Sequence, residues 1–279
     1  MTPEHDKVSL TPLIQLFVIS LLTALASYVV LFFISGYSSL YFAYDFDILA
    51  KMGLNGVVFQ TPAADAKWTF DALVTIYLSK PLTSFFVGLL AILLLMFIHQ
   101  KSTTWLYFLL WSAIWGLNGS IGSLIDDAIF GENTYAVAKA MDFSFSVLLV
   151  SGVLAAYFMY MVGVIIGRLY FVYLRNAPTY QSKERTKWIT TTILIPWMFL
   201  GLISYLNWLP GSSWWELVKN LTAIILIIPM YFIKDQLIKS TNDRRWSNLN
   251  RMDWFFLMAF IALTIWIVFT LAGEVLISG

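Results

Sequence analysis

The chain of 279 residues is 59% hydrophobic and only 12% charged, about half the charged fraction of a soluble domain. Its net charge of +1 leaves no electrostatic footprint for nucleic acid, and the lack of cysteine excludes disulfides, thiolate metal sites and cysteine nucleophiles. The apolar residues form long uncharged runs, which predict transmembrane helices. We therefore expect an all-α, polytopic membrane helix bundle, integral to a bacterial cytoplasmic (inner) membrane and without a cofactor.

Seven apolar runs are long enough to be membrane spans. The first follows a polar tail and lacks a small-residue cleavage pattern, so we expect a retained helix and not a signal peptide. Pro81 suits the first turn of the second span, whereas Pro196 predicts a kink in the fifth. The predicted spans are Leu10–Ile34, Pro81–Ile98, Trp105–Ile125, Phe143–Ile166, Trp188–Leu206, Leu217–Ile233 and Trp254–Val275.

The distribution of charge predicts how these spans are oriented. Most of the 17 basic residues fall in the connections after the even-numbered spans, chiefly Arg168–Lys187 and Lys234–Arg251, whereas most acids fall on the other side. The positive-inside rule then places the N-terminus in the cytoplasm and the C-terminus outside. We expect one transmembrane domain, residues 1–279, with a long aromatic extracytoplasmic connection, residues 35–80, that lies on the membrane surface or caps the bundle.

The stretch from Trp105 to Asp127 is where polar groups crowd a hydrophobic segment. Adjacent carboxylates at Asp126 and Asp127 are candidates for binding a cation, relaying protons or acid–base work, or else they form a solvated helix end. Asp142 follows closely and is a candidate to complete a polar cluster. Asn118, deeper in the span, either contacts a substrate or ion or joins two helices, because an amide in hydrocarbon needs partners.

Small residues on the third and fourth spans predict close helix packing. Glycine recurs every three residues in the third span, and the fourth carries a small surface that ends in a GxxxG pattern. The simplest interpretation is that these two spans pack against each other. The residues are Gly116, Gly119 and Gly122 on the third span and Gly152, Gly163 and Gly167 on the fourth.

Between Pro81 and Gly163 the chain resembles the site-2-protease (M50-type) membrane proteins. The matching features are Lys80-Pro81-Leu82-Thr83, an apolar run at Val87-Gly88-Leu89-Leu90, and Leu117-Asn118-Gly119 leading to Gly122 and Asp126-Asp127. In that family an aspartate in such a position can be a zinc ligand. The defining HExxH motif is absent here, because the first span has neither histidine nor glutamate. The resemblance thus implies a relative without zinc proteolysis, and no metal site or catalytic role is carried over.

Three functional hypotheses remain open. The first is a non-catalytic subunit or partner-binding component of a membrane assembly, since aromatic surface is abundant and no complete catalytic set is visible. The second is a small transporter or lipid-handling protein whose extracytoplasmic acidic cavity is lined by Asn118, Asp126 and Asp127. The third is a degenerate protease-like enzyme. The partners that we expect are membrane lipids and other membrane protein subunits, and no nucleic acid.

Overall fold

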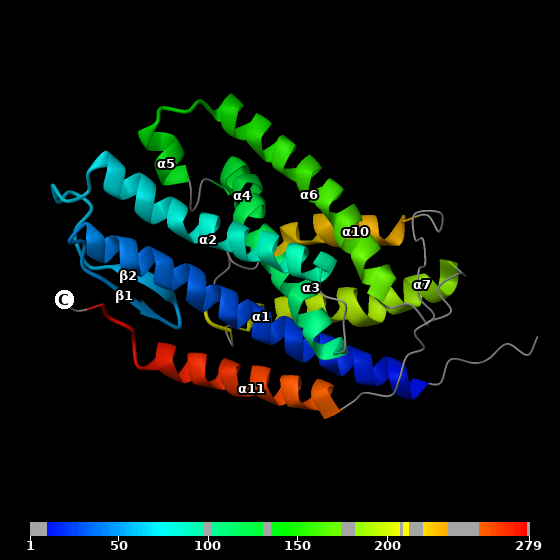
Figure 1. Cartoon of the computed structure of the whole chain (residues 1–279). Coiled ribbons are helices and arrows are strands. Elements are labelled where there is room, and N and C mark those ends of the chain that lie inside the picture. The colour runs from blue at the N-terminus through cyan, green and yellow to red at the C-terminus, as the bar shows by residue number, and fades with distance from the viewer. Residues whose placement is uncertain are drawn as a thin grey trace, which may run out of the picture.

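The computed structural model is a bundle of helices with one small β-hairpin (Figure 1). It describes residues 10–97, 102–130, 135–173, 182–206, 209–211, 220–233 and 251–277. The helices are α1 (Leu10–Asp45), α2 (Phe70–Phe97), α3 (Thr103–Leu117), the π-helical turn η1 (Asn118–Gly122), α4 (Ser123–Phe130), α5 (Tyr135–Ala140), α6 (Phe145–Tyr173), α7 (Ser182–Ile189), the π-helical turn η2 (Thr190–Leu194), α8 (Ile195–Tyr205), α10 (Ile224–Tyr231) and α11 (Arg251–Ala272). The strands are β1 (Ala50–Gly53) and β2 (Gly56–Phe59).

The helices have the lengths and composition of membrane spans. Within the described residues, six helical stretches are long and apolar enough to cross a membrane, and a shorter apolar helix covers Asn220–Tyr231. That shorter helix lies in the sixth predicted span, whose first residues are outside the described part of the chain. The structure therefore fits the predicted all-α membrane bundle, with six long apolar helices among the described residues.

The first two helices extend well beyond the predicted spans. Helix α1 has 36 residues and ends at Asp45, not near Ile34, and α2 begins at Phe70. At ~1.5 Å per residue α1 is ~54 Å long, more than a bilayer core of ~30 Å. Pro81 lies inside α2 and not in its first turn, so that prediction is wrong. Membrane helices tolerate an internal proline because neighbouring groups satisfy the freed carbonyl.

The connection between α1 and α2 is therefore shorter than residues 35–80 and folds back on the helices. Strands β1 and β2 pair antiparallel, and Gly56 takes the positive φ of 97° that the turn requires. Val275 exchanges backbone hydrogen bonds with Met52 of β1, at 3.0 and 2.7 Å. We call this part of the molecule the hairpin end. The C-terminus lies there, whereas α1 starts at the opposite end (Figure 1).

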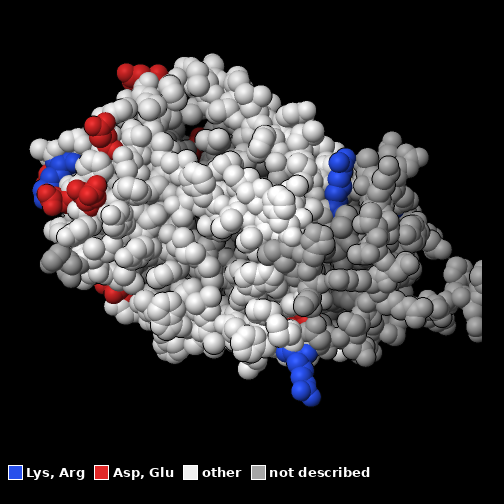
Figure 2. Space-filling view, viewed as in Figure 1, with Lys and Arg blue, Asp and Glu red and all other residues white. Residues whose placement is uncertain are grey.

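Charged side chains separate to the two ends of the molecule. Figure 2 shows acidic residues and lysines gathered at the hairpin end, single basic side chains near the other end, and an uncharged surface between them. The exposed charges at the hairpin end include Asp45, Asp47, Asp65 and Lys67. An uncharged belt of this kind is the surface expected of a protein in lipid.

Helices α1 and α3 form the centre of the bundle. In the most apolar 18-residue part of Thr103–Ile129, 78% of the residues are buried, compared with 22% in the corresponding part of α11 at the periphery. Trp111 and Trp115 of α3 stack with ring centroids 5.6 Å apart and donate indole hydrogen bonds to α1, at Ser20 Oγ (2.9 Å) and the Ala24 carbonyl (3.2 Å). Two large aromatic rings thus fix α3 against α1 and satisfy their polar N–H groups inside the membrane region.

Two glycines of the third span pack against a different helix from the one expected. A Cβ on Gly116 would lie 2.7 Å from both the Gly88 Cα and the Ser84 carbonyl oxygen of α2. Gly119 also lies beside Ser84. The close neighbour of Gly116 and Gly119 is therefore α2 and not the fourth span, because the glycines at positions 88 and 116 let the two backbones approach.

The glycines of α6 are divided between two neighbours. A Cβ on Gly152 would lie 2.8 Å from the Ala128 Cβ of α4, so this glycine does face the end of the third predicted span. A Cβ on Gly163 would instead lie 2.5 Å from the Leu226 carbonyl oxygen of α10, and Gly167 also faces α10. The GxxxG pattern therefore serves a contact between the fourth and sixth predicted spans.

Gly116→Ala is expected to destabilise the protein by about 1–3 kcal/mol, because the added methyl group overpacks the α2–α3 contact. The control is Gly201→Ala on α8, where a Cβ would meet no atom within 4 Å. Alanine there is expected to be neutral or slightly stabilising. Thermal unfolding in detergent compares the two variants. Equal effects at both positions would contradict the proposed close approach at Gly116.

At the end opposite the hairpin, a buried carboxylate joins α11 to α3. Asp253 Oδ1 accepts hydrogen bonds from Ser102 Oγ (2.8 Å) and the Thr104 backbone N–H (3.1 Å). Thr104 Oγ1 donates to the Asp253 carbonyl oxygen at 3.0 Å. Helix α11 is the least buried of the six long helices, and this polar contact joins its first turn to the start of α3.

Asp253→Ala is expected to lower stability by about 3 kcal/mol, because it removes two hydrogen bonds to a charged acceptor. Asp253→Asn retains an oxygen at Oδ1 and should lose less. Thr264→Ala on the same helix removes only a bond to the Phe260 carbonyl of α11 itself and should change stability little. Thermal unfolding in detergent measures all three, and an Asp253→Ala effect no larger than that of Thr264→Ala would refute this role.

Candidate functional site

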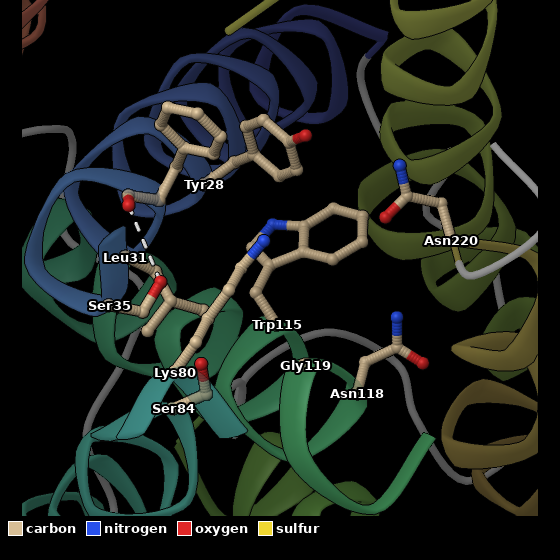
Figure 3. Close-up of a pocket in the computed structure, with 10 residues that line it drawn as sticks. Tyr28, Leu31, Ser35, Lys80, Ser84, Trp115, Asn118, Gly119 and Asn220 are labelled. Atoms are coloured by element: carbon tan, nitrogen blue, oxygen red, sulfur yellow. Dashed lines mark hydrogen bonds between the residues drawn. The ribbon is translucent and has the colours of Figure 1, made fainter. Parts of the chain in front are cut away.

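A small pocket whose largely apolar wall carries several polar side chains lies between α1, α2, α3 and η1, toward the hairpin end. Its volume is about 50 Å³, enough for a few water molecules or one compact polar group. The lining combines aromatic rings with hydroxyl, amide and ammonium groups (Figure 3). The lining residues are Tyr28, Leu31, Phe32, Ser35, Lys80, Ser84, Trp115, Asn118, Gly119 and Asn220.

Lys80 brings a positive charge into this pocket. Lys80 lies about 15 Å along the helix axis from Phe70, where α2 starts, at ~1.5 Å per residue. The ammonium lies 5.8 Å from the centroid of the Phe32 ring, a cation–π contact. In Figure 3 the side chain extends into the pocket with its nitrogen directed toward the Trp115 ring. Lys80 thus points into the bundle. A lysine near the end of a membrane helix normally extends outward to the interface instead.

Asn118 begins η1 and contributes to both structure and pocket. Its side-chain oxygen accepts a hydrogen bond from Thr222 Oγ1 at 2.8 Å, and the residue is only 2% exposed. Gly122 makes room for this bond, because a Cβ there would lie 2.8 Å from Asn118 Oδ1 and 2.9 Å from Thr222 Oγ1. The amide therefore joins two segments, as one of the two interpretations predicted, while its other atoms line the pocket beside Asn220 (Figure 3).

A short segment at 209–211 joins the hairpin to two residues of the pocket wall, Tyr28 and Phe32. Tyr28 Oη donates to the Pro210 carbonyl at 3.3 Å, and the Gly211 backbone N–H donates to the Leu54 carbonyl in the turn of the hairpin. Gly211 has a φ of 73° and lies against the Phe32 ring, so a side chain would be strained there. The hairpin therefore contacts the pocket wall through this segment.

The paired aspartates are buried and stand apart from this pocket. Asp126 and Asp127 are 4% and 3% exposed in α4, so they do not form a solvated helix end. Asp142 is exposed in the turn before α6, with a φ of 54°. Among the described residues no group of three or more acidic or histidine side chains could hold a metal ion.

Of the four polar residues predicted to form a site, only Asn118 lies in the pocket. Lys80, Ser84 and Asn220 were not expected there, because Lys80 adjoins the predicted start of the second span and was interpreted as part of the outer connection. The available signal was spacing, since Lys80, Ser84 and Gly88 recur every four residues and so share one helix face. That pattern predicts that Lys80 lies on the same inward-packing face of the helix as Ser84 and Gly88.

The coupling between Asn118 and Thr222 can be measured by a double-mutant cycle. Asn118→Ala and Thr222→Val each remove one side of the hydrogen bond, and we expect a coupling energy of about 1 kcal/mol in thermal or denaturant unfolding. Thr222→Val keeps the side-chain shape, so packing contributes little to the difference. Additive effects of the two substitutions would show that the bond contributes nothing to stability.

Comparison with known proteins identifies no relative: no family model, curated protein or solved structure matches the chain. The resemblance to M50-type proteins therefore rests only on the residues quoted above. Function has to be inferred from the pocket and its chemistry.

Proposed function

We propose that this chain is a membrane-embedded binding protein, of the small-transporter or lipid-handling kind, that takes a small polar ligand into the pocket of Lys80 and Asn118. The supporting observation is the pocket itself. A lysine, two amides and three hydroxyl-bearing residues line one small cavity inside the bundle. Polar groups at such depth are costly, and their concentration in one place is typical of ligand and transport sites.

We further propose that the hairpin end faces the extracytoplasmic side of a bacterial inner membrane. The basic connections favour this orientation. Helix α1 starts at the end opposite the hairpin, and the described chain ends at the hairpin end (Figure 1). We propose that the shorter apolar helix within Asn220–Tyr231 makes a seventh crossing, since an odd number of crossings agrees with this arrangement. In this arrangement the pocket is reached from outside, and the site is basic and amide-rich instead of the acidic cavity expected from Asp126 and Asp127.

A partner-binding subunit is the second candidate, favoured by one observation. Tyr37, Tyr41 and Tyr44 are all exposed and recur along one face of α1 near the hairpin end. Tyrosine is common both in protein interfaces and at membrane surfaces. Co-purification of other subunits at fixed stoichiometry, lost when the three tyrosines are replaced by serine, would support this function. Purification as a lone chain would count against it.

The binding function predicts that the pocket is accessible to water. Because the chain contains no cysteine, Ser84→Cys introduces a single thiol into the pocket wall. Ser27→Cys is the matched control, since Ser27 is an equally buried serine of α1 that does not line this pocket. In vesicles of known orientation, methanethiosulfonate reagents added outside should modify the Ser84→Cys protein at least about tenfold faster than the Ser27→Cys protein.

Two results would contradict the proposal. Equal and slow labelling of both variants would show that the cavity is a closed packing defect. Labelling of the Ser84→Cys protein only from the cytoplasmic side would retain the pocket but reverse the proposed orientation.

A further inference from the structure

We infer that the bundle contains an inner gate, made by Ser20, Trp111, Tyr170 and Thr192, whose hydrogen bonds hold the α7–η2–α8 stretch against its neighbours. Release of these bonds opens a path from the pocket to the end opposite the hairpin. This inference rests on the proposed function and separates a transporter from a protein that only binds. A transporter must expose its site to both sides of the membrane in turn, whereas a binding protein needs only one opening.

The gate lies between the pocket and the end opposite the hairpin. Ser20 precedes the pocket residue Tyr28 by about 12 Å along α1, at ~1.5 Å per residue, and α1 starts at that opposite end (Figure 1). Trp111 likewise lies one turn closer to the start of α3 than Trp115, which lines the pocket. Ser20, Trp111 and Thr192 are all 0% exposed. These side chains therefore close the bundle on the side of the pocket away from the hairpin.

The closure is made by hydrogen bonds that cross between helices. Ser20 Oγ donates to the Thr192 carbonyl oxygen and accepts from the Trp111 indole N–H at 2.9 Å. The Thr192 hydroxyl donates to the Trp188 carbonyl at 2.9 Å, so it accepts from the Tyr170 hydroxyl at 2.6 Å. Residue Thr192 is thus joined to α1 and α6, and through Ser20 to α3. Each bond of this kind is individually weak in a membrane, so a few of them can be exchanged between two arrangements of the helices.

The backbone beside Thr192 favours bending. In an α-helix the Thr192 carbonyl would accept the N–H of the residue four positions later, but that residue is Pro196, which has no N–H. Ser20 bonds this carbonyl instead. The π-helical turn η2 interrupts the α-helical ladder directly before α8. Helix bends concentrate at prolines and π-turns, so η2 and Pro196 form a hinge that the Ser20 bond holds closed.

Access of a membrane-impermeant reagent to the closed side tests the gate. Leu16→Cys places a single thiol on α1, one turn before Ser20 on the same face, at a position that is 2% exposed. Trimethylammonioethyl methanethiosulfonate is added to vesicles of known orientation, on the side of the end opposite the hairpin. Ser20→Ala should raise the labelling rate about tenfold, because loss of a buried hydrogen bond shifts the population toward the open arrangement.

Ala91→Cys is the matched control reporter. Ala91 lies on α2 at a similar depth from the same end and is 3% exposed, but α2 contributes no residue to the gate. Its labelling should not respond to Ser20→Ala. An equal rise in both reporters would reveal a general loss of packing and overturn the inference. An unchanged rate for the Leu16→Cys protein would overturn it as well.

Pro196→Ala makes the opposite prediction and does not depend on the folding of the Ser20→Ala variant. Alanine supplies an N–H that can bond the Thr192 carbonyl within the helix and stiffens the hinge. Labelling of the Leu16→Cys protein should therefore fall about threefold or more, and an unchanged or faster rate would contradict the gate. These outcomes leave the test of the pocket separate: labelling of the Ser84→Cys protein from the hairpin side, with a Leu16→Cys protein that is never labelled, would establish binding without a gate.

Discussion

The close approach of α2 and α3 at Gly88 and Gly116 is the contact on which the site depends. Neither helix could come so near if either residue carried a side chain, because a Cβ on Gly116 would lie within 2.7 Å of the α2 backbone. Ser84 and Lys80 precede Gly88 by one and two helical turns on the same face. The glycine contact therefore directs the lysine toward the Trp115 and Asn118 side of the bundle, not toward lipid.

The interior around this contact satisfies its polar groups by hydrogen bonds between helices. Trp111 donates to Ser20, whose hydroxyl donates to the Thr192 carbonyl in η2, and Tyr170 of α6 bonds the Thr192 hydroxyl at 2.6 Å. The π-helical turn η2 contains Thr192, which makes these hydrogen bonds, and η1 contains Asn118, which lines the pocket. Local departure from α-helix at a functional or strained position is a known use of π-turns. Asn118 likewise has two roles, because its side-chain oxygen bonds Thr222 while its other atoms line the pocket.

The two ends of the bundle are closed by different means. At one end Asp253 ties α11 to the start of α3 through side-chain hydrogen bonds. At the other, the hairpin pairs with Val275 and holds segment 209–211 against Tyr28 and Phe32. Lys51 and Glu274 add an exposed ion pair at 3.0 Å, which contributes little in water. The hairpin thereby links segment 209–211 to Val275 near the end of the described chain.

Hydropathy alone determined the class of this protein and the approximate position of its spans, because hydrocarbon imposes long apolar runs whatever their neighbours are. It also singled out Asn118, since an amide in such a run must find a partner. The tertiary structure decided the rest. Gly116 was assigned to the wrong neighbouring helix, Lys80 was taken for part of a loop, and Asp126 and Asp127 were allowed a solvated position that they do not have. Each of these depends on which faces of which helices meet, and in a membrane that choice is made by local packing and hydrogen bonds, not by hydrophobicity, which is nearly uniform around every span.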